Sequence, residues 1–259
     1  MKLSELKSQA ERLRHEFDLD GYVSIPGFFS LEEIEEIREQ LDRFIQEVVP
    51  TLPPAEVYYD DKEDHQTLKQ IQQLGRHDPY FERLVSPGSR LATLSEICLE
   101  EPVRPVNLQY FNKPATVSTP TPPHQDGYFF CLTPCRAITL WIALEDIAPE
   151  QGCLNYVQGS HRYGMRAHGS SGVLGFSQTI LDFGHPFDRE NARSFPCQAG
   201  HLMAHHALTI HWADGNHSGD RTRQAMGAVF YGESSQEDVE TKRAYQARLD
   251  AELAAQGKI

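Results

Sequence analysis

The sequence contains few cysteines for its length, five in 259 residues, and they form no C-x-x-C pair. They are Cys98, Cys131, Cys135, Cys153 and Cys197. An odd set without paired spacing argues against a disulfide framework and against a zinc knuckle. Because reduced thiols are typical of a cytosol, the sequence predicts a cytoplasmic protein.

Long apolar runs and clusters of basic residues are also missing. No segment reaches the roughly 20 apolar residues that cross a bilayer as a helix, and the first residues form a charged amphipathic pattern rather than a signal peptide. With 24 Lys and Arg against 37 Asp and Glu, the net charge is −13 and is spread along the chain. Such a chain offers little to neutralise phosphates, so we expect no nucleic-acid partner, no membrane partner and no highly anionic substrate. The sequence leaves the oligomeric state open.

Two kinds of hydrophobic periodicity divide the chain. Up to about residue 100 the spacing is helical, and it predicts helices over 3–20, 31–48, 68–74 and 91–99, a short strand over 21–29 and a surface loop over 51–63. Ser30 and Glu33 form a capping box at the start of the second helix. From about residue 104 the hydrophobic residues follow a period of two, and frequent Gly and Pro residues interrupt them. This pattern predicts strands over 106–111, 137–144, 152–157, 200–205 and 225–231. The segment 239–255 predicts a solvent-exposed helix.

Helices followed by many short strands are typical of an α+β fold whose β part is a double-sheet barrel of the jelly-roll or cupin kind. The length suits one large domain. We therefore expect a single domain over 1–259, with a helical N-terminal part over about 1–100. The β core should span about 104–232, and a C-terminal helix should cover about 238–255.

The segment 122–128, with the sequence PPHQDGY, carries the most distinctive chemistry. Side chains two residues apart on an extended segment point to the same side, so His124 and Asp126 can bind one metal ion. Completed by a second histidine, such a pair forms the 2-His-1-carboxylate face of non-haem Fe(II) sites, which leaves positions open for a co-substrate and oxygen.

The third ligand must come from another part of the chain, and a late histidine cluster offers candidates. The cluster contains His201, His205, His206, His211 and His217. His211 is favoured because it lies at a predicted strand end beside a polar loop, where barrel sites form. His205 and His206 can equally be residues of the barrel wall. Downstream, Arg221 and Arg223 offer guanidinium groups that could bind a carboxylate in bidentate fashion.

Several segments together resemble the phytanoyl-CoA dioxygenase-like family from about residue 17 to 232. They are 20–28 (DGYVSIPGF), 112–114 (NKP), 124–126 (HQD), the strand with Trp141, 152–154 (GCL) leading to 159–161 (GSH), and the tail with His211, Asn216, Ser218 and Arg223. The resemblance implies a double-stranded β-helix and an Fe(II)- and 2-oxoglutarate-dependent oxygenase that consumes O2.

The resemblance also implies roles for single residues. His124, Asp126 and His211 match the iron ligands, and Arg223 most nearly matches the arginine that binds the distal carboxylate of 2-oxoglutarate. Gln109, Trp141 and Lys69 match positions that line the co-substrate pocket.

This chain departs from the family pattern in two places. The loop after His211 is one residue longer, so Arg221 remains a rival to Arg223. Ala213 replaces a hydroxyl residue that is common two positions after the distal histidine, so one expected hydrogen bond to the co-substrate is either lost or supplied from elsewhere.

The expected reaction is hydroxylation of a C–H bond in a small organic molecule, with release of succinate and CO2. Asp126 favours hydroxylation, because related halogenases leave this carboxylate position vacant for halide. Tyr128 and Phe129 follow the metal motif and are candidate substrate-binding residues, whereas His161 is assigned to structure or to the surroundings of the metal ligands. The alternative is a cupin-type metal-binding barrel without oxygenase activity, such as an isomerase or a sensing module.

Overall fold

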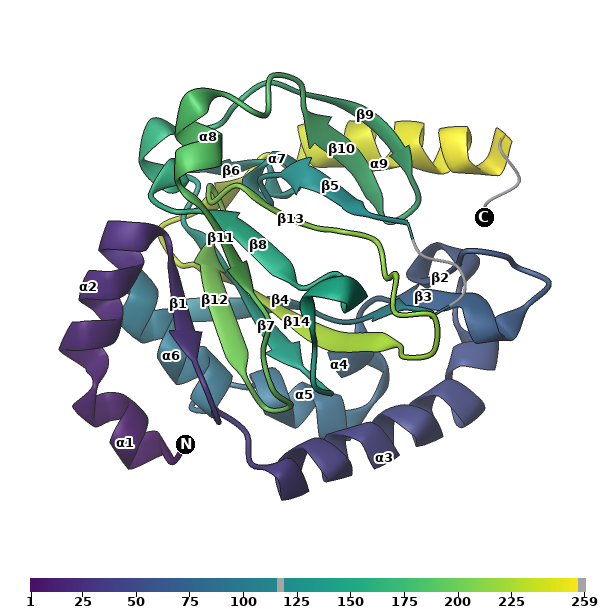
Figure 1. The fold of residues 1–259 in the computed structure, drawn as a ribbon, viewed down its shortest axis with the longest axis horizontal. Helices are drawn as coiled ribbons and strands as arrows, with labels where there is room; N and C mark the ends of the chain where they lie inside the picture. The colour runs from purple at the N-terminus through teal and green to yellow at the C-terminus, as the bar shows by residue number, and fades with distance from the viewer. Residues whose placement is uncertain (116–118, 256–259) are drawn as a thin grey trace.

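A computed structural model of the chain describes residues 1–115 and 119–255 (Figure 1). The helices are α1 (Leu3–Ser8), α2 (Ala10–Asp20), α3 (Leu31–Glu47), α4 (Leu74–His77), α5 (Pro79–Val85), α6 (Arg90–Leu99), α7 (Gly127–Phe130), α8 (Pro186–Glu190) and α9 (Val239–Ala255). The strands are β1 (Tyr22–Ile25), β2 (Val57–Tyr59), β3 (Leu68–Ile71), β4 (Val103–Lys113), β5 (Thr121–His124), β6 (Leu132–Thr133), β7 (Ala137–Ala143), β8 (Leu154–Val157), β9 (His168–Val173), β10 (Phe176–Ile180), β11 (Ala192–Phe195), β12 (Leu202–His206), β13 (His211–Ala213), β14 (Arg223–Gly232) and β15 (Gln236–Glu237). No described helix is long and apolar enough to span a membrane.

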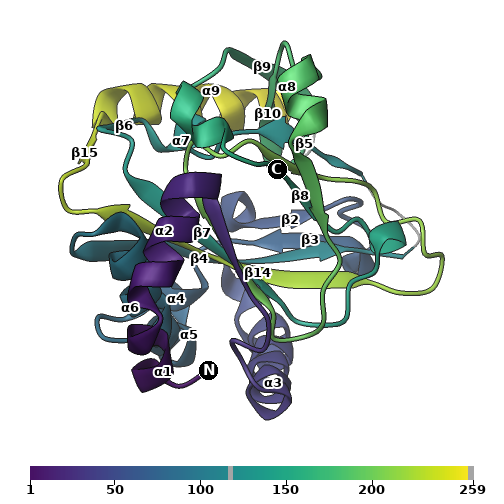
Figure 2. The ribbon, with the colours of Figure 1, turned by 60° about the vertical axis from the view of Figure 1, so that its left-hand side comes forward.

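A seven-stranded antiparallel sheet in the order β1-β12-β7-β14-β4-β3-β2 forms the centre of the molecule. Alternation along its strands gives the sheet two different faces. Leu108, Leu140 and Met226 point outward and join a core that also contains Phe44 of α3 and Leu94 of α6. Figure 2 shows α2, α3, α5 and α6 gathered on this side of the sheet. The helical half of the chain therefore covers one face and leaves the other for a site.

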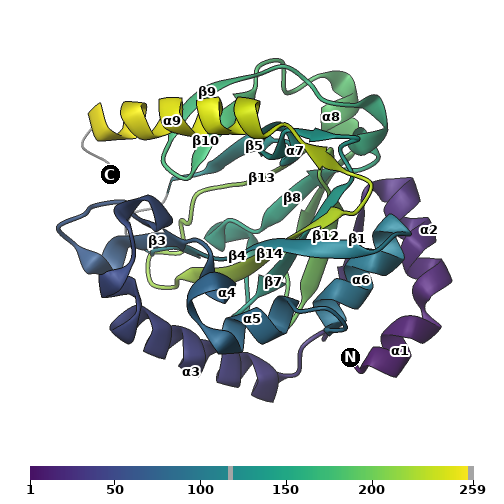
Figure 3. The same cartoon turned by 180° about the vertical axis from the view of Figure 1, so that it is seen from behind.

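A four-stranded sheet in the order β11-β8-β13-β5 lies opposite the free face of the large sheet (Figures 1 and 2). Two facing antiparallel sheets with helices on the outside are the predicted α+β jelly-roll arrangement, so the expected fold class is confirmed. The β9–β10 hairpin and α9 lie at one end of the space between the sheets, as the view from behind shows (Figure 3).

The capping box of α3 forms as predicted. The amide of Glu33 donates to Ser30 Oγ at 3.3 Å, and the amide of Ser30 donates to Glu33 Oε2 at 2.8 Å.

The first predicted helix is divided into α1 and α2, and it ends at Gly21 in the left-handed region with φ 81°.

Two predictions for the first hundred residues are wrong. The segment 68–74 is not a helix, because Leu68–Ile71 forms β3 and only Leu74–His77 is helical. All four β3 residues are buried between β2 and β4, so burial in the sheet decides the structure of this segment. The helical spacing of Leu68, Ile71 and Leu74 is therefore a coincidence. The supposed loop over 51–63 contains β2, which pairs Val57 with Ile71.

Candidate metal centre

The two histidines and the carboxylate of the predicted ligand set lie together in the structure. Ligand atoms of His124, Asp126 and His211 are all within 4.8 Å of one another. Asp126 Oδ1 is 3.4 Å from His124 Nε2 and 3.5 Å from His211 Nε2. Ligands held about 2.0–2.2 Å from one metal ion are separated by roughly 3 Å, so the three groups fit a single ion with little movement.

Strand pairing explains why residues so far apart in the sequence converge. β13 pairs with β5 in the smaller sheet, and His211 is the direct partner of His124. β5 ends at His124, and Asp126 already has helical backbone angles at the start of α7. The expectation that both residues of the H-x-D motif lie on one extended segment is therefore wrong for Asp126, which turns into the site as the N-cap of a short helix.

Backbone carbonyls orient both imidazoles. His124 Nδ1 lies 2.8 Å from the carbonyl of Pro122, and His211 Nδ1 lies 3.0 Å from that of Thr209. A carbonyl only accepts, so each Nδ1 carries the proton and each Nε2 presents its lone pair to the metal position. Burial, together with the nearby His124 and His205, holds the pKa of His211 well below its usual value. His211 is therefore neutral at pH 7, the form that binds a metal.

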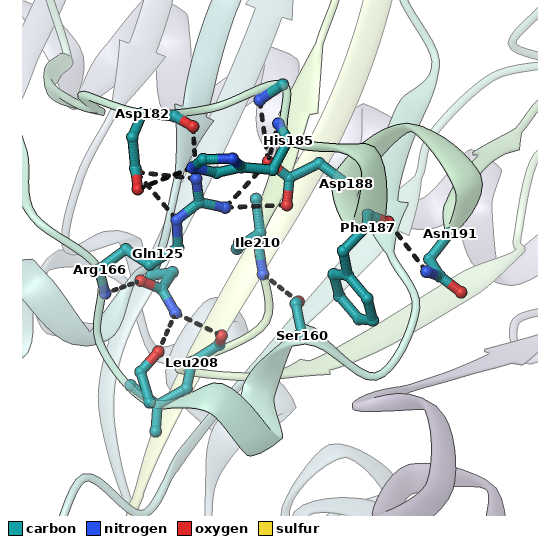
Figure 4. A network of polar contacts seen from close by, with 12 residues as sticks. Gln125, Ser160, Arg166, Asp182, His185, Phe187, Asp188, Asn191, Leu208 and Ile210 are labelled. Atoms are coloured by element: carbon teal, nitrogen blue, oxygen red, sulfur yellow. Dashed lines mark hydrogen bonds and ion pairs between the residues drawn. The ribbon is translucent and has the colours of Figure 1, made fainter.

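Gln125, between His124 and Asp126, is fully buried, and its carboxamide is part of a polar network (Figure 4). Its Nε2 donates to the carbonyls of Gly164 at 2.9 Å and Leu208 at 2.7 Å, and its Oε1 accepts from the amide of Arg166 at 2.8 Å. Arg166 in turn binds both carboxylate oxygens of Asp188. The network ties the metal motif to the segment that leads to the distal histidine. No pattern in the sequence indicated this role for Gln125.

The ligands face a cavity of about 350 Å³ between the two sheets. Of the predicted site residues, Gln109, Trp141, Arg223 and Phe129 line this cavity together with the three ligands. Gln109 and Trp141 are neighbours across Gly227 of β14. An added Cβ on Gly227 would lie 2.8 Å from the ring of Phe111, so this wall is packed too closely for a larger residue.

Two other predicted residues do not line the cavity. Tyr128 stacks on His168, with ring centroids 4.5 Å apart. Lys69 Nζ forms a buried ion pair with Asp60 at 3.0 Å and donates to Thr119 Oγ1 at 2.6 Å. The structure therefore does not bring either side chain to the metal position.

The two candidate arginines differ sharply in their surroundings. Arg221 is half exposed and pairs with Glu150 at 2.6 Å. Arg223 begins β14, is only 5% exposed, and lies over the ring of Trp141 at 5.8 Å. Its Nε has no hydrogen-bond partner among the described residues. Burial lowers its pKa to about 10, so the guanidinium stays charged at pH 7. A buried guanidinium with an unpaired N–H is costly, and an anionic ligand in the cavity would offset that cost.

Three features of the site were missed at the level of sequence. His205 and Thr139 both contact Asp126. The predicted solvent-exposed helix is α9, but Lys242, Tyr245, Gln246 and Leu249 of α9 line the cavity. Their spacing of three and four residues places them on one helix face, which was the available signal.

Comparisons with known proteins agree with this geometry. A model of the family described as phytanoyl-CoA dioxygenase (PhyH) matches residues 17–225. A phytanoyl-CoA dioxygenase domain-containing protein 1 homolog of Caenorhabditis elegans is 24% identical over 256 residues, covering 82% of this chain and 88% of the relative. A probable alpha-ketoglutarate-dependent hypophosphite dioxygenase of Stutzerimonas stutzeri is 26% identical over 218 residues, covering 83% and 76%.

Among solved structures, the chain is similar to the epimerase SnoN in complex with Fe3+, alpha ketoglutarate and nogalamycin RO. The TM-score is 0.72 at 26% identity, with 89% of this chain and 86% of SnoN covered. The resemblance predicted from the sequence motifs is thus confirmed over most of the chain. Because the family model covers well over half of its residues, the chain belongs to the phytanoyl-CoA dioxygenase (PhyH) family.

Proposed function

We propose that this chain is an Fe(II)- and 2-oxoglutarate-dependent oxygenase that hydroxylates a C–H bond of a small organic molecule and releases succinate and CO2. The observation that carries the proposal is the convergence of His124, Asp126 and His211 on a cavity that Arg223 also lines. Arg223 is buried, and its Nε has no hydrogen-bond partner among the described residues. Family membership and the cofactors of SnoN support the same cofactor set, which is Fe(II), 2-oxoglutarate and O2.

In this proposal each residue of the site has a separate task. His124, Asp126 and His211 would hold Fe(II), and the cavity beside them would receive the co-substrate. Arg223 binds the distal carboxylate of 2-oxoglutarate with its guanidinium, which suits a planar acid better than a lysine would. Once bound, iron and 2-oxoglutarate together activate O2 for oxidation of the substrate. The protein supplies position, charge and exclusion of water.

The cavity walls support an uncharged substrate. Carboxamides of Gln70, Asn107 and Gln109 line one wall, and Gln70 Oε1 is buried without a hydrogen-bond partner among the described residues. Phe129 and Phe176 line another part, each with its ring within 6 Å of His124. Carboxamides and aromatic rings bind hydroxyl or carbonyl groups on an apolar framework. The described lining offers no cation for a phosphorylated carrier beyond Arg223 and Lys242.

Lys242 itself is engaged, since its Nζ lies 2.7 Å from Glu237 Oε2 and 5.5 Å above the ring of Tyr231. The outer cavity is therefore close to neutral. SnoN, whose solved complex contains nogalamycin RO, also supports an organic molecule as the substrate class. Because SnoN is an epimerase, the reaction type in this chain must be tested directly.

The test is turnover of a metabolite library with Fe(II), 2-oxoglutarate and O2. Succinate release coupled to a product that has gained one oxygen atom is expected. Succinate release with a product two hydrogen atoms lighter would replace hydroxylation by desaturation or ring closure, and a product of unchanged mass would indicate epimerisation. Metal binding without any effect of 2-oxoglutarate on the melting temperature would favour the cupin-type binding or isomerase alternative.

A further inference from the structure

We propose that His205 is a positioning residue which, with Thr139 and Tyr156, holds the Asp126 carboxylate so that only Oδ1 binds the metal. The inference rests on the metal centre of the proposed function. It assigns a role to His205, a third histidine beside the site. The sequence alone left two roles for this residue, a metal ligand or a residue of the barrel wall.

The two oxygens of Asp126 have different surroundings. Oδ1 faces the Nε2 atoms of His124 and His211 at 3.4 and 3.5 Å. Oδ2 accepts a hydrogen bond from Thr139 Oγ1 at 2.6 Å and lies 3.1 Å from His205 Nε2. With two neighbours on Oδ2, the carboxylate is held against rotation about its Cβ–Cγ bond. One oxygen is left for the metal, and the other is occupied by the protein.

A hydrogen-bond chain fixes the direction of the His205 ring. His205 Nε2 must donate to the carboxylate, since an ionised carboxylate only accepts. The other nitrogen, Nδ1, lies 2.8 Å from the hydroxyl of Tyr156, which keeps its proton because burial raises the pKa of Tyr156 well above its usual value. Tyr156 therefore donates, and the order of donation is Tyr156 to His205 to Asp126. His205 is 2% exposed and Tyr156 is fully buried.

Packing makes this chain rigid. The Tyr156 ring stacks on Tyr22 with centroids 4.7 Å apart, and its edge meets Phe195 at 5.6 Å. His205 lies on β12 of the large sheet, and Tyr156 lies on β8 of the smaller sheet. The contact therefore joins the two sheets directly behind the metal position.

His205 does not act as a fourth ligand in this arrangement, because both ring nitrogens are already engaged. Its neighbour His206 points to the opposite face of β12. The His206 ring lies 5.9 Å from Phe17 and 5.6 Å from His161, away from the ligands. His206 therefore provides a matched control at the adjacent position of the same strand.

Loss of the His205 donor would let the carboxylate rotate and offer both oxygens to one ion. Partners that orient metal ligands typically contribute about 10–100-fold to metal affinity. We expect His205→Ala to raise the Kd for a divalent ion by about that factor, and His205→Gln, which keeps an N–H donor, to raise it much less. The Kd of Tyr156→Phe should lie between those of the two His205 variants. In Tyr156→Phe the His205 ring loses its partner on Nδ1 but keeps the Nε2 donor to Asp126.

The experiment is anaerobic titration with Mn(II), followed by the EPR signal of the free ion, on the full-length chain at one pH. Wild type, the three variants and the control His206→Gln are compared, and melting curves without metal report on folding. The prediction is a loss of affinity in His205→Ala, partial recovery in His205→Gln, and a wild-type Kd in His206→Gln.

Two results would overturn the inference. One is a folded His205→Ala protein that binds Mn(II) as tightly as wild type, and the other is an equal loss in His206→Gln. If His205→Ala does not fold, Tyr156→Phe decides, because a wild-type Kd in that variant contradicts the chain of donation. A wild-type protein that does not bind Mn(II) would instead refute the metal centre and with it the proposed function.

Discussion

Arg223 is the residue whose surroundings distinguish a 2-oxoglutarate site from a bare metal site. Hydrogen bonds to charged groups contribute about 1.5–3 kcal/mol each, so we expect Arg223→Ala to raise the Kd of 2-oxoglutarate by roughly 10–100-fold. Metal affinity should change little. The measurement is calorimetric titration of the Mn(II)-loaded protein with 2-oxoglutarate.

Arg221→Ala is the matched control for this prediction, since Arg221 pairs with Glu150 at the surface. Its Kd for 2-oxoglutarate should equal that of wild type. A larger loss in Arg221→Ala than in Arg223→Ala would transfer the carboxylate site to Arg221. The two residues look alike in the sequence, and only burial separates them.

The buried imidazole of His206 makes the free energy of unfolding depend on pH. Burial, with smaller contributions from His161, Arg136 and His205, lowers its pKa to about 3 in the folded chain, against an ordinary value of 6.5. Between these values the unfolded chain binds a proton that the folded chain does not, so the free energy of unfolding falls as the pH falls from about 6.5 toward 3. Above pH 6.5 the contribution is fully present. Denaturant unfolding from pH 7.5 to 4.5 should show this loss, and His206→Gln should reduce its slope.

At the scale of elements, the helices with caps and the long strands could be predicted from the sequence, whereas short buried strands could not. Ser30 and Glu33 encode the start of α3 by local hydrogen bonds alone. β3 depends on its neighbours, because a strand buried on both faces shows no alternation. The β9–β10 hairpin, with its glycines and serines, also gave no periodic signal.

The cavity face of α9 was likewise hidden, since most residues of that helix are exposed. Tyr245 hydrogen-bonds to Ser177 of β10 and lines the cavity together with Leu249. We expect Tyr245→Ala to raise the KM for the organic substrate while leaving the Kd values of metal and 2-oxoglutarate unchanged. Tyr163→Ala, at a 71% exposed tyrosine outside the cavity, is the control. Equal effects of the two variants would contradict a substrate-binding role for α9.

On the scale of the whole molecule, the helical half and the strand half share one hydrophobic core, in which Phe44 and Leu94 pack with Leu140 and Met226. We propose on this basis that 1–259 folds as a single domain. Unfolding in urea should then follow one transition, with far-UV circular dichroism and tryptophan fluorescence giving the same midpoint. Separate midpoints for the two signals would instead indicate two independently folding parts.

The grouping of His124, Asp126 and His211 was predictable because the H-x-D motif and the distal histidine lie in a multi-part family pattern, and the structure pairs His124 directly with His211. The sequence could not reveal which neighbours hold those ligands, since the contacts of Gln125 and His205 cross between strands distant in the chain. Substrate chemistry was equally hidden, because the cavity walls come from both sheets and α9. The predicted cytoplasmic location stays a prediction.

The most direct test of the central claim is the visible absorption spectrum of the protein with Fe(II) and 2-oxoglutarate under anaerobic conditions. Chelation of iron by the 2-oxo acid should produce a weak charge-transfer band, which appears only when protein, metal and co-substrate are all present. Asp126→Ala and Arg223→Ala should each weaken or remove the band at equal ligand concentrations. A folded wild-type protein that shows no band and is not stabilised by 2-oxoglutarate would contradict the account.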